Sequence, residues 1–496
     1  MADVEGNVNI QEGYDGDNGE LDPLITSIGN RSRRNCVNRL HCFYSDTDTF
    51  IHLIKANVGS GLLALPAAVK NAGYIVGPVG ILVLGFIATH CIGLLLESAK
   101  KLCQWKKIAA LDYSETMQFA LLKKGFNRNV ANIGKMVVNL FLIVTQLGFC
   151  SIYFVFIADS FQQVLKEAYC VTMPEKLLVA IFLIPVVVFC WVQNINSLSA
   201  LSLVANVSIA IGLVVIFYDE ASYLATKKGS SMQLHAAGNL MNISLFFGTA
   251  FYSVEGIGVV LPLENKMKQP THAKSVVYCG MAVVTILFAL FGAIGYLTYG
   301  ENTQASVTLN LCSNNELTTI LFLITKMLFV VSIFVSYMIQ FYVPMDIVEP
   351  SILKFIDQLT NKLPVLCMTY QATIKTVLRL CFRTLVVLLT ASLALAIPDL
   401  GDLINLVGSV ASSALSMIFP PFIHLLTFWN WKSSHTKGNK IISSFFWILK
   451  DIIIILLGIM GFAFGTIASL HSIVSDMKHK NSSSFCKSTF VLSCEL

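Results

Sequence analysis

Long runs of uncharged residues constrain the fold of this chain more than any other feature. The segment from Met136 to Ala158 holds 23 residues without an Asp, Glu, Lys or Arg, and the segment from Ser275 to Gly300 holds 26. A helix that crosses a bilayer needs about 20 such residues. The runs are continuously apolar rather than alternating, so they indicate helices and not the strands of a membrane barrel. Only 13% of the 496 residues are charged, whereas soluble proteins carry roughly 25%. We therefore predict an all-α polytopic membrane protein embedded in a lipid bilayer.

Apolar segments of this kind recur along the chain and predict about eleven membrane spans. The uncharged stretch from Leu177 to Tyr218 is long enough for two of them, and we divide it at the polar residues Gln193 to Ser199. The predicted spans cover residues 51–75, 77–98, 134–158, 177–193, 198–218, 239–262, 275–299, 317–343, 378–398, 402–427 and 445–472.

Lysine and arginine are distributed unevenly between the connecting segments. With a cytoplasmic N-terminus, the inner segments hold 21 of these residues and the outer segments hold 7. Cytoplasmic loops of membrane proteins carry an excess of Lys and Arg. We therefore predict a cytoplasmic N-terminus and an extracellular or luminal C-terminus. The basic loops are interpreted as topology signals, so no nucleic-acid partner is expected.

Composition divides the chain into three parts. Residues 1–48 are polar, first acidic and then basic, and carry no secretory signal peptide. They predict a disordered cytoplasmic tail. Residues 49–475 form the predicted transmembrane domain, and residues 476–496 form an extracellular or luminal tail.

This topology places four cysteines, Cys170, Cys312, Cys486 and Cys494, and one sequon outside the cytoplasm. Cys170 and Cys312 fall in outer loops, where a disulfide is permitted, whereas the cytoplasmic face does not permit one. A disulfide between them and two free thiols both fit the sequence. Asn481 begins an Asn-Ser-Ser sequon in the outer tail and predicts a glycosylation site.

Two of the spans contain the same interruption. "GSGLLALP" (Gly59–Pro66) lies in the first predicted span and "GIGVVLP" (Gly256–Pro262) lies in the sixth. These positions correspond if the first ten spans are two repeats of five. Glycine-interrupted spans at corresponding positions of two halves indicate the substrate site of a secondary transporter. The competing interpretation is close helix packing at small residues.

A broken span exposes backbone groups that a ligand can use. Irregular backbone at membrane depth is tolerated only inside protein or beside a polar cavity. The N–H groups at the start of a half-helix suit a carboxylate, and free carbonyl groups suit a cation. The predicted substrate-binding residues lie at the two breaks and in the third span: Asn57, Val58, Gly59, Ser60, Gly61, Tyr153, Tyr252, Ser253 and Gly256.

Ionisable residues flank both breaks. His52 and Lys55 precede the first break, and Glu255 adjoins the second. Charges inside a membrane are costly and indicate function by default, and histidine titrates near neutral pH. His52 and Glu255 are the predicted proton-coupling residues. An interfacial histidine, and a Glu255 that only pairs with Lys55 or with the broken backbone, fit the sequence as well. Lys326 in the eighth span is interpreted as an interface residue rather than a counter-ion.

The chain lacks the sequence motifs of an enzyme. It contains no P-loop, no paired metal ligands, no nucleophile elbow and no CxxC. We therefore predict no catalytic residue, no metal site and no cofactor.

Five longer segments carry a family resemblance. They are "IHLIKANVGSGLLALPAAVKNAG" (Ile51–Gly73), "FLIVTQLGFCSIYFVFIAD" (Phe141–Asp159), "LFFGTAFYSVEGIGVVLPLENKM" (Leu245–Met267), "IQFYVPMDI" (Ile339–Ile347) and "LVGSVASSALSMIFPP" (Leu406–Pro421). In this order they closely resemble the proton-coupled amino acid transporters of the amino acid/auxin permease superfamily.

The resemblance implies both a fold and a function. It implies about eleven transmembrane helices with a five-plus-five inverted repeat and breaks in helices 1 and 6. It also implies symport of small neutral amino acids such as glycine, alanine and proline, with the proton as coupling ion. His52 matches the family's proton-coupling histidine, Glu255 begins its "EGIG" motif, and Cys170 with Cys312 matches its outer-loop disulfide.

The chain departs from the family pattern beside the first break. Where members often read "KGNIGTGLLGLP", this chain reads "KANVGSGLLALP", with Ala56 and Ala64 in place of glycine. An ending similar to "FVPAEI" reads "YVPMDI" here, with Met345 and Asp346. These larger side chains would narrow or shift the range of amino acids that the site accepts. The exact amino acid and the tightness of proton coupling are therefore left open.

A short motif in the N-terminal tail concerns localisation. In "ELDPLI", Glu20 stands four residues before Leu24 and Ile25, which fits an acidic dileucine signal. Adaptor or signalling proteins would bind this tail. The motif favours a lysosomal or endosomal membrane, and the plasma membrane is the alternative.

The combined prediction is symport by alternating access. The amino acid carboxylate would bind the backbone N–H groups of Gly59 to Gly61, and the ammonium group would face carbonyls near Tyr252 and Ser253. The alternatives are a sodium-coupled or proton-independent amino acid transporter, a lysosomal amino acid sensor and a channel.

Overall fold

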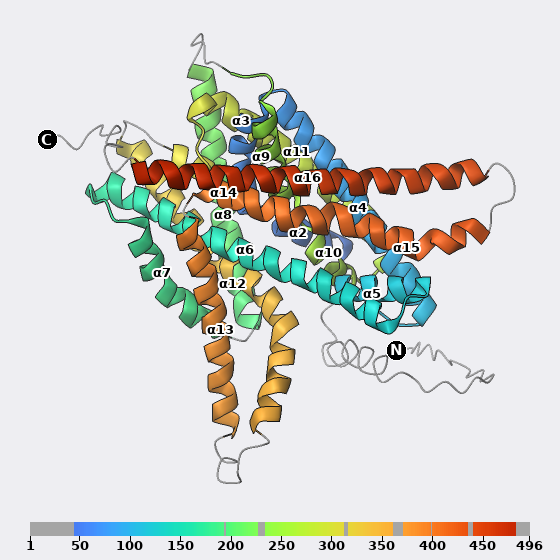
Figure 1. The fold of residues 1–496 in the computed structure, drawn as a ribbon. Helices are drawn as coiled ribbons and strands as arrows, with labels where there is room; N and C mark the ends of the chain where they lie inside the picture. The colour runs from blue at the N-terminus through green and yellow to red at the C-terminus, as the bar shows by residue number, and fades with distance from the viewer. Residues whose placement is uncertain are drawn as a thin grey trace, which may run out of the picture.

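The computed structural model describes residues 44–192, 195–226, 234–311, 316–360, 371–397, 399–434 and 440–482. Within these ranges the regular structure is helical, apart from one isolated bridge between Tyr44 and Met267. Figure 1 shows long helices packed along one another, with α3 beside α9 and α11. The predicted all-α fold is confirmed.

The helices follow one another with short connections. In chain order they are α2 (Asp46–Asn57), α3 (Ser60–Ala72), α4 (Val76–Lys106), α5 (Tyr113–Lys124), α6 (Arg128–Tyr169), α7 (Glu175–Cys190), α8 (Ile195–Thr226), α9 (Leu240–Val254), α10 (Ile257–Glu264), α11 (Ala273–Tyr299), α12 (Glu316–Thr360), α13 (Gln371–Ala396), α14 (Leu400–Val407), α15 (Phe419–Ser434) and α16 (Lys440–Ser482). Between α14 and α15 the chain is π-helical over Gly408–Ser412 and Ala414–Ile418.

The described helices account for most of the predicted spans. Nine are long and apolar enough to cross a membrane, and the bent pair α2 and α3 raises the number to ten. The predicted span 177–193 corresponds to α7, whose 16 residues are fewer than the roughly 20 that a full crossing needs. A polytopic membrane protein is therefore confirmed, whereas the count of eleven and the inverted repeat stay predictions.

Both predicted helix breaks are present. α2 ends at Asn57 and α3 begins at Ser60, with a bend of 53° between them. α9 ends at Val254 and α10 begins at Ile257. In each case the interruption falls at the first glycine of the Gly-x-Gly motif, because glycine stabilises a helix less than other residues and tolerates unusual backbone angles.

The packing places the first broken span at the centre of the bundle. α3 lies against α9 and α11, α11 lies against α4, and α12 lies against α6 and α8. The outer faces carry large apolar side chains, and Phe86, Ile184 and Val214 each expose more than two thirds of their surface. Such apolar outer faces are expected where helices contact lipid rather than water.

The first described helix begins at Asp46, three residues before the predicted start of the membrane domain. Ser45 caps α2, because its hydroxyl accepts a hydrogen bond from the Asp48 backbone N–H at 3.1 Å, and the Asp48 carboxylate accepts one from the Ser45 N–H, also at 3.1 Å. This reciprocal capping box is a strong helix start. The predicted sorting residues Glu20, Leu24 and Ile25 lie outside the described residues.

The predicted outer disulfide is described at one of its two cysteines. Cys170 is disulfide-bonded and follows the last residue of α6, with a left-handed φ of 53°. Cys312 lies outside the described residues, so the pairing of these two stays a prediction. Asn481 lies in the last turn of α16, and its glycosylation also stays a prediction.

Candidate functional site

The two helix breaks lie against each other. The Ser60 and Tyr252 hydroxyl oxygens are 2.6 Å apart, and the Ser253 hydroxyl donates to the Gly61 carbonyl oxygen at 2.8 Å. Both contacts join residues 192 positions apart in the chain. The structure therefore brings together four of the residues that the sequence assigned to one substrate site.

Glycines allow the two broken spans to approach closely. A Cβ atom on Gly61 would lie 2.8 Å from the Ser253 Cα atom, and one on Gly256 would lie 2.4 Å from Asn57 Oδ1. At these two positions the close-packing interpretation of the glycines is correct. Gly59 differs, because a Cβ atom there would have no atom within 4 Å. Packing thus explains Gly61 and Gly256 but not Gly59, which borders open space.

The first half-helix presents unsatisfied backbone donors to this space. Gly59 precedes the first residue of α3, and no side chain caps the helix there. The first N–H groups of any helix have no partner within the helix. The N–H groups of Ser60 and Gly61 belong to this set, and they begin the helix beside Gly59. A negatively charged group is the natural partner for such a helix start.

Asn57 adds an unsatisfied acceptor at the same break. Its side chain is 5% exposed, and its Nδ2 atom donates to the Leu53 carbonyl oxygen at 2.8 Å. Its Oδ1 atom has no hydrogen-bond partner among the described residues. Buried polar atoms are nearly always hydrogen-bonded, so a ligand with a donor group would satisfy this oxygen.

Aromatic rings border the site on one side. The Tyr252 ring contacts Phe149 of α6 edge to face, with 4.8 Å between the ring centroids. Tyr153 lies one helical turn along α6 and is buried beside Ser60 and Gln340. Tyr153 thus takes part in the predicted site. Phe149 was missed, although its spacing of four residues from Tyr153 places both on one helix face.

Glu255 has a partner that the sequence did not predict. Its carboxylate accepts a hydrogen bond from the Ser412 hydroxyl at 2.5 Å, while Lys55 is solvent-exposed. Ser412 ends the π-helical segment that follows α14. π-Helical turns occur frequently at functional sites. The structure thus links Glu255 to the tenth predicted span and does not show the alternative pairing with Lys55.

The end of α14 and the π-helical segment after it pack on the second broken span. Asn405 accepts a hydrogen bond from the Thr249 hydroxyl. A Cβ atom on Gly408 would lie 1.9 Å from the Gly248 carbonyl oxygen, so the two helices cross with backbone against backbone. Ser409 is fully buried, and its hydroxyl oxygen has no partner in the described part of the chain. The small residues in "LVGSVASSALSM" were the available signal, since small residues mark close helix contacts in membranes.

His52, the other predicted proton-coupling residue, lies in α2, before the first break. His52 is partly buried, and its ring centroid is 4.6 Å from that of Tyr44. It precedes Asn57 by five residues, which is about 7.5 Å along a helix. No hydrogen bond or ion pair joins His52 to Glu255 among the contacts of the described residues.

The interface interpretation of Lys326 is wrong. Its side chain is 0% exposed, and its Nζ atom lies 2.6 Å from Glu167 Oε1 in α6. A lysine this deeply buried needs a counter-ion, because an isolated charge is very costly away from water. The sequence could not indicate this pair, since the two residues are 159 positions apart.

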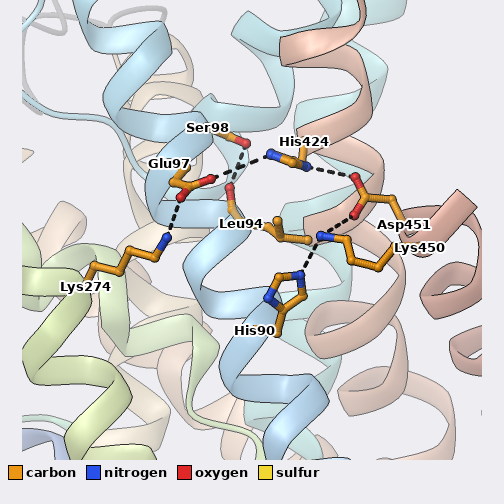
Figure 2. A network of polar contacts seen from close by, with 8 residues as sticks. All are labelled: His90, Leu94, Glu97, Ser98, Lys274, His424, Lys450 and Asp451. Atoms are coloured by element: carbon orange, nitrogen blue, oxygen red, sulfur yellow. Dashed lines mark hydrogen bonds and ion pairs between the residues drawn. The ribbon is translucent and has the colours of Figure 1, made fainter. Parts of the chain in front are cut away.

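A second polar network lies away from the helix breaks (Figure 2). It joins α4, α11, α15 and α16 through His90, Glu97, Lys274, His424, Lys450 and Asp451. Asp451 is fully buried, and its carboxylate lies 2.8 Å from His424 Nδ1 and 3.1 Å from Lys450 Nζ. None of these six residues was singled out from the sequence, because they lie within or beside apolar runs and no motif marks them.

Comparison with known proteins shows the family of this chain. A family model described as "Transmembrane amino acid transporter protein" matches residues 44–471. The chain is 31% identical to the proton-coupled amino acid transporter-like protein pathetic of Drosophila melanogaster, over 87% of this chain and 85% of that protein. It is 26% identical to vacuolar amino acid transporter 3 of Schizosaccharomyces pombe, over 82% of this chain and 56% of that longer protein.

Solved transporter structures show a loose overall likeness. Mhp1, a nucleobase-cation-symport-1 family transporter in a closed conformation with bromovinylhydantoin bound, has a TM-score of 0.48 at 13% identity. That match covers 90% of this chain and 96% of Mhp1. MhsT in complex with L-phenylalanine has a TM-score of 0.44 at 14% identity, over 86% of this chain and 97% of MhsT.

The family match extends over both helix breaks, the π-helical segment and most of the predicted spans. The chain therefore belongs to the transmembrane amino acid transporter family, and it is a membrane transporter rather than an enzyme.

Proposed function

We propose that this chain symports small neutral amino acids with protons by alternating access, with residues 49–475 as the transporter domain. The observation that carries the proposal is the meeting of the two helix breaks, Ser60 with Tyr252 and Gly61 with Ser253. Secondary transporters bind substrate where two broken helices from different repeats meet. The five-plus-five inverted repeat and its eleven helices are part of this proposal.

The amino acid carboxylate binds at the start of α3. Gly59 borders open space, and the following N–H groups lack a side-chain cap. A carboxylate there satisfies these donors and interacts favourably with the positive end of the helix. Val58 and Gly59 together allow the chain to turn between α2 and α3.

The ammonium group binds on the opposite side of the same space. The Asn57 Oδ1 atom is an acceptor without a partner in the described structure, and backbone carbonyls at the end of α9, near Tyr252 and Ser253, are further acceptors. The backbone of Gly256 lies so close to Asn57 that even a methyl group at position 256 would overlap the Asn57 side chain. The space for the ammonium group is therefore narrow. The rings of Phe149, Tyr153 and Tyr252 limit the side chain to a small, uncharged group.

Protons couple to this site through Glu255 and His52, with no other cofactor. Glu255 adjoins the second break and accepts a hydrogen bond from Ser412 of the tenth predicted span. Protonation of Glu255 changes that contact and so changes how α9 and the π-helical segment hold each other. The relative named as a proton-coupled amino acid transporter-like protein supports this part of the proposal.

The protein resides in the lysosomal or endosomal membrane, with the plasma membrane as a second location. The acidic dileucine motif Glu20, Leu24 and Ile25 in a cytoplasmic tail would bind adaptor proteins, and a relative is named as a vacuolar transporter. The C-terminal tail and the segments that contain Cys170 and Cys312 are then extracellular or luminal. This side of the membrane permits a Cys170–Cys312 disulfide and glycosylation at Asn481.

Uptake of labelled proline and glycine tests the function. Cells would express the chain with Leu24→Ala and Ile25→Ala, so that it accumulates at the surface. Uptake would be measured at about pH 5.5 and about pH 7.4, on either side of the histidine pKa, with and without sodium. We expect saturable uptake that rises at acidic pH and does not depend on sodium.

The other outcomes correspond to the alternatives. Sodium-dependent uptake would identify a sodium-coupled transporter, and uptake independent of both ions would identify facilitated transport. Binding of proline or glycine without uptake, at verified surface expression, would identify a sensor. Flux that does not saturate would identify a channel.

A further inference from the structure

Glu220 in α8 is a buried carboxyl group that has no partner in the described part of the chain. Its side chain is 0% exposed, and neither Oε1 nor Oε2 has a hydrogen-bond partner among the described residues. The neighbouring Asp219 differs, since it is partly buried and accepts a hydrogen bond from the Tyr299 hydroxyl at 3.0 Å. Glu220 takes no part in the substrate site described above.

The carboxyl group lies where three helices meet. A Cβ atom on Gly295 of α11 would be 3.1 Å from Glu220 Oε1 and 2.5 Å from the Pro66 Cγ atom of α3. The Glu220 carboxyl group therefore lies at the contact between α3 and α11, beside the bare backbone of Gly295. A small movement of α3 relative to α11 and α8 would change its exposure to water.

Among the described residues, no cation forms a contact with this carboxyl group. Lys70 of α3 directs its Nζ atom to the Thr303 carbonyl oxygen at 3.2 Å. On α11, the Tyr296 hydroxyl donates to Glu301 at 2.8 Å, and the Tyr299 hydroxyl donates to Asp219. The nearest charged neighbour on α8 itself is Asp219, another acid. An ionised carboxylate in this environment would be both desolvated and repelled, whereas a protonated carboxyl group is tolerated.

We propose that Glu220 is a proton-binding residue of the transport cycle. This inference rests on the proposed proton symport and assigns the proton a residue in addition to those flanking the breaks. A proton from water on the acidic side binds one carboxylate oxygen, and the neutral group is then enclosed by α3 and α11. When these helices separate, water reaches the carboxyl group and the proton returns to water.

Binding of the proton and of the amino acid are linked through α3. The start of this helix holds the substrate carboxylate at Gly59 to Gly61, and Pro66 contacts the region of Glu220 from the same helix. Ser60 and Pro66 are six positions apart, which corresponds to about 9 Å along a helix. Because α3 is short and bent away from α2 by 53°, it can move as one unit, so closure over the substrate also encloses the protonated Glu220.

Two substitutions and one matched control test this assignment. Glu220→Gln and Glu220→Met both remove the titratable group at similar size, and Met needs no hydrogen bond in an apolar site. Asp219→Asn removes the adjacent carboxylate and serves as the control. All would be made with Leu24→Ala and Ile25→Ala. Uptake would be measured against external pH, and substrate-driven proton entry would be measured with a pH-sensitive dye in proteoliposomes.

We expect uptake by the wild-type chain to rise at acidic pH and to be accompanied by proton entry. In Glu220→Gln and Glu220→Met the ratio of acidic to neutral uptake should fall to about one and proton entry should be lost, while labelled substrate still exchanges across the membrane. Asp219→Asn should behave as wild type. Normal pH dependence and proton entry in either Glu220 variant would overturn the assignment of Glu220 and would leave the proposed proton symport standing. Uptake by the wild-type chain without pH dependence would overturn the proposed proton symport, and this assignment with it.

Discussion

Alanine at two neighbouring glycines should affect this transporter in opposite ways. At Gly61 a Cβ atom would lie 2.8 Å from the Ser253 Cα atom, closer than real Cβ atoms approach other atoms. The obstacle is backbone, so α3 and α9 must move apart. At Gly59 a Cβ atom meets nothing within 4 Å, and a φ of −156° is available to any residue.

The contacts set the expected magnitudes. Overfilling a well-packed contact costs about 1–3 kcal/mol, so Gly61→Ala should lower the folded or substrate-closed population by a factor of roughly 5 to 150. Gly59→Ala carries no such strain. Replacing glycine where alanine fits stabilises a protein by about 0.4–1 kcal/mol. The added methyl group, however, occupies the space assigned to the substrate carboxylate.

The two variants separate packing from binding. The thermal midpoint would be measured on detergent-solubilised protein by fluorescence-detected size exclusion, and KM would be measured by proline uptake. Gly61→Ala should lower the midpoint, whereas Gly59→Ala should leave it unchanged or raise it while KM increases. A wild-type midpoint for Gly61→Ala would refute the close contact of α3 and α9. A wild-type KM for Gly59→Ala would refute the position of the substrate.

Three further predictions concern the polar contacts. Glu255→Gln should abolish transport at normal surface expression, and normal uptake by this variant would exclude Glu255 from the mechanism. Ser412→Ala removes the hydroxyl that contacts Glu255 and should reduce uptake about tenfold, which corresponds to a loss of roughly 1.4 kcal/mol. Glu167→Gln should lower the free energy of unfolding by up to about 3–5 kcal/mol, because Lys326 would be left buried without its ion-pair partner. Adding Lys326→Met should restore most of the loss. Additive losses in this double-mutant cycle would show that Glu167 and Lys326 do not stabilise each other. Asp451→Asn should weaken the network of Figure 2 and lower the thermal midpoint, and an unchanged midpoint would show that the network does not hold the four helices together.

Much of the fold and of the site could be predicted because the signals are local. Apolar runs of sufficient length indicate membrane helices wherever they occur, and Gly59 and Gly256 mark the two breaks because glycine weakens a helix at its own position. Repetition of the motif in the first and sixth spans then indicated that residues from both breaks, such as Ser60 and Tyr252, would meet. The structure confirms that contact at 2.6 Å.

The partners of the buried charges could not be predicted in this way. Glu255 contacts Ser412, Lys326 pairs with Glu167, and Glu220 has no partner in the described structure. Hydropathy shows that each residue lies in or beside an apolar run, but not which side of its helix faces another helix. That facing depends on the rotation and crossing angle of each helix, which packing sets between segments more than 150 positions apart.

The sequence by itself thus determined that the chain is a bundle of membrane helices, and it located the two breaks, because burial in lipid and helix interruption are properties of short segments. Only the tertiary structure decided which polar groups are satisfied. It closed Gly61 against Ser253, left space beside Gly59, and enclosed Glu220 without a hydrogen-bond partner among the residues that the structure describes. These outcomes depend on how closely particular helices approach one another.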